Sequence, residues 1–346
     1  MNSIMAIARG ALVCLSLVAG TVACGGGGTQ QTPAGGSTAP QTITADGSST
    51  VAPVTEAVAE EFQKANPGTR VTVGTSGTGG GFQKFCRDET DISDASRPIR
   101  ENEAKTCAAA NIQFIEIPVA YDGLSVVVNP KNTWASSMTL AELKKLWEPA
   151  AQGKITKWSQ VRPGWPDREI HLFGAGVDSG TFEYFTEATV GQSKQSRGDY
   201  TSSEDDNVIV QGVSGDELAL GYFGYAYYEQ NKDKLKLVAI DDGNDANGQG
   251  PIAPSPETVK NGTYRPLSRP IFIYPKLKSL DRAEVRNFVD YYLTKGLPLI
   301  REVGYIPLGD GEYDMIRKRF AARKTGSMFE GADSHRQLTL EQRLSR

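Results

Sequence analysis

The chain has 346 residues, 39% of them apolar, with 37 Lys plus Arg against 41 Asp plus Glu. This length is enough for about two domains, and the apolar content excludes a disordered chain. A net charge of −4 argues against a broad nucleic-acid-binding surface, which needs a basic face. Two His and four Cys residues leave little material for metal sites. We therefore expect no nucleic-acid partner, no metal and no cofactor.

The N-terminal segment has the pattern of an export signal. Arg9 precedes an uncharged apolar run from Ala11 to Ala23, which is too short for the ~20 residues that span a bilayer. The run ends in Thr21-Val22-Ala23-Cys24, which is similar to a bacterial lipobox except that Thr21 replaces a larger apolar residue. We predict a signal peptide over residues 1–23. Ordinary cleavage after Ala23, without lipidation, is the alternative.

The residues after the signal predict a membrane tether. Lipidated Cys24 would begin the mature chain, and a Gly-, Ser- and Pro-rich flexible segment would extend to residue 41. This arrangement places the protein outside the cytoplasm, anchored to the membrane through Cys24.

Two cysteines remain in the mature chain, Cys86 and Cys107. Export to an oxidising compartment favours one disulfide between them. Two buried free thiols are the alternative. Neither cysteine belongs to a C-x-x-C pair, so a redox-catalytic role is not expected.

From Thr42 to about Arg323, short β-branched segments alternate with amphipathic ones, which predicts α/β layers. Strands are expected at Thr42–Ala45, Arg70–Val73, Ile112–Ile117, Leu124–Val128, Ile170–Phe173, Leu235–Ile240 and Ile271–Tyr274, and a buried strand or turn at Leu220–Tyr228. Helices are expected after Val51, after a capping box that begins at Thr139, and over Asp281–Thr294 and Asp310–Ala322. The polar residues after Arg323 form either a frayed tail or an amphipathic turn at Leu338–Leu344.

Three turns share the order strand, small polar residues, helix. They are Asp46 to Thr50, Thr75 to Gly81 and Asp178 to Thr181. The first turn of a helix carries unpaired N–H groups and a partial positive charge, and small residues let an oxyanion approach them. Any one turn is explained by ordinary helix capping, but three together predict an anion cage.

Catalytic interpretations of these turns fit poorly. The glycine-rich second turn lacks the Gly-Lys-Ser/Thr ending of a P-loop, and no G-x-S-x-G motif surrounds Ser179. His171 lies in the strand before the third turn, where we expect a structural role. We therefore predict a protein with no catalytic residues.

The segment Asp91 to Ile99 (DISDASRPI) places an acid and a base near the second turn. Arg97 could bind a dianion bidentately, while Asp94 could accept a hydrogen bond from the protonated oxygen of hydrogen phosphate. Sulfate has no such proton and would meet an unpaired carboxylate. A surface Asp–Arg pair is the alternative.

At this point the chain resembles the periplasmic or lipid-anchored phosphate-binding proteins of ABC transporters, of PstS type and most closely the SphX-like branch. The resemblance covers Thr42 to Arg323 and rests on an ordered set of motifs. They are DGSSTVAPV, SGTGGGF, DISDASRPI, YDGLSVVVNP, VDSGTFEYF, EDDNVIVQGVSG and LGYFGYAYY.

The resemblance implies a ligand set and partners. The phosphate ligands would be Ser49, Thr50, Ser76, Gly77, Thr78, Asp94, Arg97, Asp178, Ser179, Gly180 and Thr181. Better-known members carry an arginine before the third turn where this chain has Ala175-Gly176, so Arg97 is inferred as the cation. A monomer that delivers phosphate to membrane permease subunits is expected.

The resemblance also implies the type II periplasmic-binding fold, an α/β fold of two lobes with two crossovers and a ligand cleft between them. Lobe one would combine residues 42–122 with 242–323, lobe two would span 123–241, and residues 324–346 would be a polar tail. The crossovers are expected near Ala120 to Leu124 and Val238 to Asp242. A receptor for arsenate, sulfate or molybdate, or a secreted phosphatase, is the alternative.

Overall fold

The computed structural model describes residues 41–177, 179–203, 205–329 and 339–345. The predicted signal peptide, Cys24 and nearly all of the tether therefore lie outside the described residues, as does Asp178. None of the helices within the described residues is long and apolar enough to cross a membrane.

Strands and helices alternate along the chain, as the sequence predicts. The strands are β1 (Gln41–Gly47), β2 (Thr69–Gly74), β3 (Ile92–Ala95), β4 (Ile117–Val128), β5 (Ser137–Thr139), β6 (His171–Ala175), β7 (Thr201–Ser203), β8 (Ala219–Gly224), β9 (Lys236–Leu237), β10 (Ala239–Asp241) and β11 (Ser268–Pro275). The α-helices are α1 (Ala52–Ala65), α2 (Gly77–Cys86), α3 (Glu101–Ala109), α4 (Leu140–Trp147), α5 (Trp158–Val161), α6 (Gly180–Val190), α7 (Asp206–Gly215), α8 (Tyr225–Gln230), α9 (Pro256–Lys260), α10 (Ala283–Tyr292), α11 (Leu297–Glu302), α12 (Asp310–Ala321) and α13 (Leu340–Leu344). Two 3₁₀ turns lie at Pro149–Ala151 and Ser279–Asp281.

The main sheet has the strand order β2-β1-β3-β11-β4-β8-β6-β7, with β9 beside β4. β1 pairs in parallel with β2 and β3, and β6 pairs in parallel with β7 and β8. β11 runs antiparallel to both β3 and β4. β5 and β10 form a separate two-stranded sheet.

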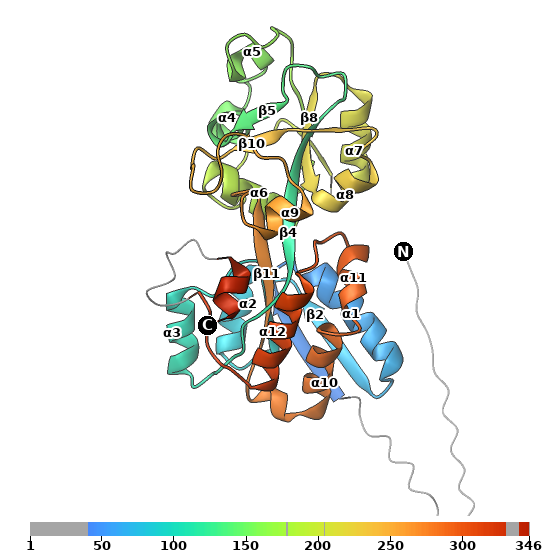
Figure 1. Cartoon of the computed structure of the whole chain (residues 1–346), viewed down its shortest axis with the longest axis vertical. Helices are drawn as coiled ribbons and strands as arrows, with labels where there is room; N and C mark the ends of the chain where they lie inside the picture. Colours follow the sequence, from blue (N-terminus) through green and yellow to red (C-terminus); the bar gives the residue numbers. More distant parts are fainter. Residues whose placement is uncertain (1–40, 178, 204, 330–338, 346) are drawn as a thin grey trace, which may run out of the picture. The chain divides into compact units, whose positions relative to one another are not determined.

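β4 is a fully buried strand that belongs to two groups of strands. The first group contains β1, β2, β3 and β11, and the second contains β6, β7, β8 and β9. Its first part, up to Gly123, pairs with β11, and from Leu124 onward it pairs with β8. Figure 1 shows β4 and β11 side by side where the two groups meet. The change of partner between Gly123 and Leu124 falls inside the segment where the first crossover is expected.

The return to the first group lies later in the chain than expected. Val238 to Asp242 contains β10, which pairs with β5, and Ile240 also bridges to Ile252. Pairing with β4 next to the first group resumes at Ser268, opposite Gly123. We therefore propose a second crossover near Ser268, which would move residues 242–267 from lobe one to lobe two.

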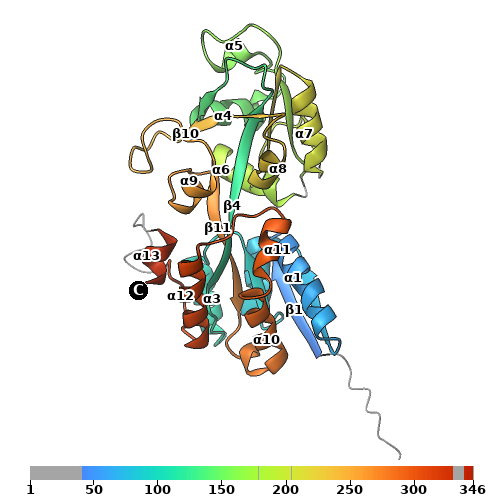
Figure 2. The ribbon, with the colours of Figure 1, turned by 45° about the vertical axis from the view of Figure 1, so that its right-hand side comes forward.

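Each group of strands has its own covering of helices. Helix α1 contacts both α10 and α11 beside the first group (Figure 2), and Phe62 of α1 packs edge-on against Phe288 of α10. In the second group, Phe185 of α6 stacks on Tyr222 of β8, with 3.6 Å between ring centroids. All four rings belong to one buried hydrophobic cluster that extends through both groups.

The described part of the C-terminal segment packs on the first group. Gly326 bridges to Ile115, and the Met328 N–H donates to Glu116. Leu340 of α13 is buried, and the Arg343 guanidinium lies over the ring of Phe329. Residues 330–338 are not described.

Candidate functional site

The first turn joins β1 to α1 through Ser48, Ser49 and Thr50. Only glycine fits at Gly47, because a Cβ atom there would lie 2.1 Å from the Asp94 carbonyl oxygen. The Ser48 N–H donates to that same carbonyl, and the Thr50 N–H donates to Ser48 Oγ. Ser49 Oγ is buried and makes no hydrogen bond to any residue that the structure describes. Its hydroxyl is therefore available to a ligand.

The second turn begins α2. Asp46 at the end of β1 holds Ser76, the N-cap residue of that helix. Ser76 donates both its N–H and its hydroxyl to Asp46 Oδ1. Lys84 Nζ lies 2.6 Å from Asp46 Oδ2. Burial raises the pKa of Asp46, but Lys84 and Ser76 outweigh it and leave the pKa below its ordinary value. The Ser76 hydroxyl is thus already committed within the protein.

Thr78 and Ser96 form a hydroxyl pair at the start of α2. Their oxygen atoms are 3.0 Å apart, and the Ser96 N–H also donates to Thr78 Oγ1. Ser96 is a candidate that the sequence interpretation missed. Its signal was present, because it is a hydroxyl residue directly after a β-branched strand that leads toward the second turn.

The third turn begins α6, where Ser179 is the N-cap and its Oγ accepts from the Thr181 N–H at 3.1 Å. Gly180 lies directly against the first turn. A Cβ atom at Gly180 would stand 2.4 Å from Thr50 Oγ1 and 2.6 Å from Thr50 N. Turns from the two groups of strands therefore meet, and glycine is required where they do.

The three predicted turns are connected through these contacts. The first and second are joined through Asp46, the second and the end of β3 through Thr78 and Ser96, and the first and third through Gly180. Each turn starts a helix of ten or more residues, so three N-terminal partial positive charges gather in one region. That arrangement suits a tetrahedral anion.

Asp94, the predicted acceptor, lies beside the first turn, where its carbonyl oxygen accepts from the Ser48 N–H. Its carboxyl is fully buried, and neither oxygen accepts a hydrogen bond of ordinary geometry from the described residues. Burial raises the pKa of Asp94 to about 7, while the Thr55 hydroxyl on α1 opposes that rise. Tyr292 on α10 is close enough for the carboxyl to affect its pKa. These neighbours place the carboxyl beside α1 and α10.

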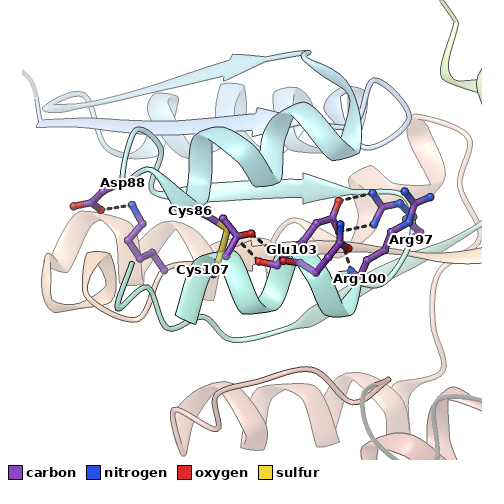
Figure 3. The surroundings of a disulfide bond; sticks show 9 residues. Cys86, Asp88, Arg97, Arg100, Glu103 and Cys107 are labelled. Atoms are coloured by element: carbon purple, nitrogen blue, oxygen red, sulfur yellow. Dashed lines mark hydrogen bonds and ion pairs between the residues drawn. A yellow bond between two sulfur atoms is a disulfide. The ribbon is translucent and has the colours of Figure 1, made fainter. Parts of the chain in front are cut away.

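Arg97 is held by a carboxylate of its own. Its Nη1 and Nη2 lie 2.8 and 2.7 Å from the two oxygens of Glu103, and Nη1 also donates to the Pro98 carbonyl. Glu103 also accepts from the Arg100 N–H at the start of α3 (Figure 3). Bidentate hydrogen bonding to a dianion would require Arg97 to break its hydrogen bonds with Glu103.

The predicted disulfide between Cys86 and Cys107 is present. It joins the end of α2 to α3, close to Glu103 (Figure 3). No group of three or more metal-ligating side chains occurs among the described residues. His171 is exposed and pairs with Asp216 on the surface.

Two α/β groups of strands, joined by a long shared strand and meeting at helix N-termini, define a two-lobed substrate-binding protein. The family model described as the PBP superfamily domain matches residues 32–295. The chain belongs to this superfamily.

Named relatives place the chain more narrowly. Protein SphX of Synechocystis is 47% identical over 88% of this chain and 90% of its own length. The phosphate-binding protein PstS of Staphylococcus saprophyticus is 38% identical over 84% of this chain and 86% of its own length. A crystal structure of a possible phosphate binding protein from Planctomyces limnophilus is 48% identical, covers 83% of this chain and 100% of that one, and has a TM-score of 0.78. The chain is of the PstS and SphX type.

Proposed function

We propose that this protein captures inorganic phosphate between its two lobes and delivers it to the membrane subunits of an ABC importer. The observation that carries the proposal is the contact of Gly180 with Thr50, which brings helix N-termini of both lobes together. Relatives that bind phosphate or serve phosphate ABC transporters support the choice of anion. Binding at such a site breaks no bond, so we expect a receptor and not an enzyme.

The geometry favours a revised ligand set. The free hydroxyl of Ser49, the hydroxyls of Thr78 and Ser96, and the N–H groups of Gly180 and Thr181 are proposed as donors, with the site closed by the lobes. Because a hydroxyl can accept as well as donate, the Thr78 and Ser96 pair can also accept a hydrogen bond from the protonated oxygen of hydrogen phosphate. This assigns to the hydroxyl pair the role that the sequence suggests for Asp94.

The test is a calorimetric titration of the mature protein, unfolded and refolded to remove bound anion, with phosphate and then sulfate. We expect one-to-one binding of phosphate and negligible heat with sulfate. A correctly folded sample that does not bind phosphate would contradict the proposed function. Tighter binding of sulfate would reassign the protein to another oxyanion.

Asp94→Asn separates the two candidate acceptors in the same titration. We expect the ratio of phosphate to sulfate affinity to stay within about threefold of the wild type, because the buried carboxyl interacts with Thr55 of α1 and Tyr292 of α10. A smaller ratio of phosphate to sulfate affinity in Asp94→Asn would show that Asp94 accepts the hydrogen bond from hydrogen phosphate. Ser96→Ala is the matched variant and should weaken phosphate binding by about tenfold, the size expected for loss of a hydrogen bond to a charged group.

We further propose that the protein works as a monomer outside the cytoplasm and is tethered through lipidated Cys24. The apolar run before Cys24 and the flexible segment after it support this proposal. Cys24→Ser should move the protein from the membrane fraction to the soluble extracytoplasmic fraction. Cys14→Ser, within the apolar run, is the control and should leave the protein with the membrane.

A further inference from the structure

A buried ion pair lies on the two strands that join the lobes. Arg269 of β11 stands opposite Asp122 of β4 in the strand register. Arg269 Nε is 3.5 Å from Asp122 Oδ2, and the two side chains are 14% and 8% exposed. Neither motif matching nor hydrophobic periodicity singled out this pair.

Arg269 borders both the first and the third turn. Its Nη2 donates to Thr50 Oγ1 at 3.3 Å. Its guanidinium carbon lies 3.5 Å from the ring centroid of Tyr184, one helical turn beyond Gly180 on α6. Thr50 itself is the residue against which Gly180 packs. The cation therefore adjoins the place where the two lobes meet.

The carboxylate partner of Arg269 compensates its charge only loosely. Arg97 has two short contacts to Glu103, whereas the contact of Arg269 with Asp122 is long. Arg269 Nε and Asp122 Oδ2 also make no hydrogen bond of ordinary geometry to described residues. Burial also raises the pKa of Asp122, against the influence of Arg269. Much of the positive field of Arg269 is therefore left for another anion.

The surroundings make an uncompensated cation unfavourable until an anion arrives. Arg269 is largely removed from water and lies near the positive ends of α1 and α6. A dianion held by the turns would offset all three positive charges at once, in a site of low dielectric constant where such interactions are strong. Because Arg269 lies on a strand that joins the lobes, the same interaction would favour lobe closure.

We propose that Arg269, and not Arg97, supplies the positive charge that stabilises the bound anion, acting as a positioning residue through Thr50 and through its field. This inference rests on the proposed function and names the cation of that site. The role of Asp122 is to hold the guanidinium in place and to moderate its charge.

The experiment compares the phosphate dissociation constants of the mature wild-type protein and of Arg269→Gln, Arg269→Lys, Asp122→Asn and Arg97→Gln, at low and high salt. We expect Arg269→Gln to weaken binding about tenfold or more and to reduce its dependence on salt. Arg269→Lys should stay within about threefold of the wild type. Asp122→Asn should bind as tightly as the wild type or more tightly, because it removes the counter-charge.

The different outcomes expected for Arg269→Gln, which loses affinity, and Asp122→Asn, which does not, exclude a merely structural pair, since breaking a structural pair from either side weakens binding. The proposal is overturned if Arg269→Gln binds within twofold of the wild type, if Asp122→Asn loses as much as Arg269→Gln, or if Arg97→Gln has the larger loss. Lys260→Gln, which like Arg269 lines the cavity of about 630 Å³ beside β11, is the control for a general charge effect and should change affinity less than twofold. Failure of the wild type to bind phosphate would contradict the proposed function instead.

Discussion

At the scale of single residues, Asp94 is the acid with the most unusual environment near the site. Its carboxyl is fully buried, and burial raises its pKa to about 7. The unfolded chain releases this proton near pH 4, whereas the folded protein retains it until about pH 7. Over that range the unfolded state binds fewer protons, so folding loses stability as the pH rises.

Asp94→Asn should remove this pH dependence. We expect the variant to be more stable than the wild type to unfolding at about pH 8, by up to about 4 kcal/mol, with the difference vanishing near pH 4. Urea unfolding followed by circular dichroism at several pH values measures it. The exposed Asp233→Asn should leave the pH profile unchanged, and an equal gain for Asp94→Asn at every pH would show that proton release is not the cause.

The sequence predicted the hydroxyl-rich turns well, because Ser49, Thr78 and Gly180 belong to local strand-to-helix motifs. It could not predict the partners of Asp94 and Arg97. The direction of the Asp94 side chain depends on which face of the short strand β3 it occupies, and Glu103 reaches Arg97 from a helix that folds back on α2. Arg269 was missed because the turns it adjoins are more than 80 residues away in sequence.

At the scale of elements, local signals were reliable where a helix start specifies its own hydrogen bonds. The expected capping box at Thr139 is present, with Thr139 Oγ1 accepting from the Glu142 N–H and Glu142 accepting in return. The strand expected at Ile112–Ile117 does not form as a regular strand. Phe114 and Ile115 make only isolated bridges, to Lys276 and Gly326, and β4 begins at Ile117, because regular pairing needs a neighbouring strand that periodicity does not reveal.

The disulfide is the element-scale feature with the clearest energetic consequence. It closes a loop with a sequence separation of 21 between α2 and α3. Replacing both cysteines by serine should lower the free energy of unfolding by about 3 kcal/mol, measured by denaturant unfolding under non-reducing conditions. Lys105→Gln removes an exposed ion pair on α3 and should change it by less than about 0.5 kcal/mol. Equal effects of the two changes would mean that the crosslink contributes little.

At the scale of the whole molecule, we expect the contact of Gly180 with Thr50 to link lobe closure to phosphate binding. Gly180→Ala would place a methyl group within 2.6 Å of the Thr50 backbone nitrogen. We expect it to weaken phosphate binding by about 1–3 kcal/mol, the usual cost of overpacking, and to reduce the compaction that phosphate causes in small-angle X-ray scattering.

The matched control for this variant is Gly311→Ala, because a Cβ atom at Gly311 of α12 meets nothing within 4 Å. It should leave both affinity and compaction as in the wild type. Normal compaction of Gly180→Ala with saturating phosphate would contradict the link between this contact and closure.

The two-lobed α/β class followed from the resemblance of ordered motifs, and the strand order and the related proteins agree with it. The position that we propose for the second crossover did not follow from the resemblance. Val238 and Ile240 are buried apolar residues that suit either lobe, and the pairing of this segment with β5 and the hydrogen bond from the Val238 N–H to the Val126 carbonyl connect it to the second group.

The sheet order also has a consequence for the synthesis of the chain. β11 lies between β3 and β4, yet it is translated after every other strand of that sheet. The growing chain can complete the pairing of β6 with β7 and β8 while the first group still lacks its central strand. A chain truncated before Ser268 would contain Ser49, Thr78, Ser96 and Thr181, but not the strand that joins β3 to β4. Loss of the final quarter of the chain should therefore abolish binding as completely as loss of the ligand residues themselves.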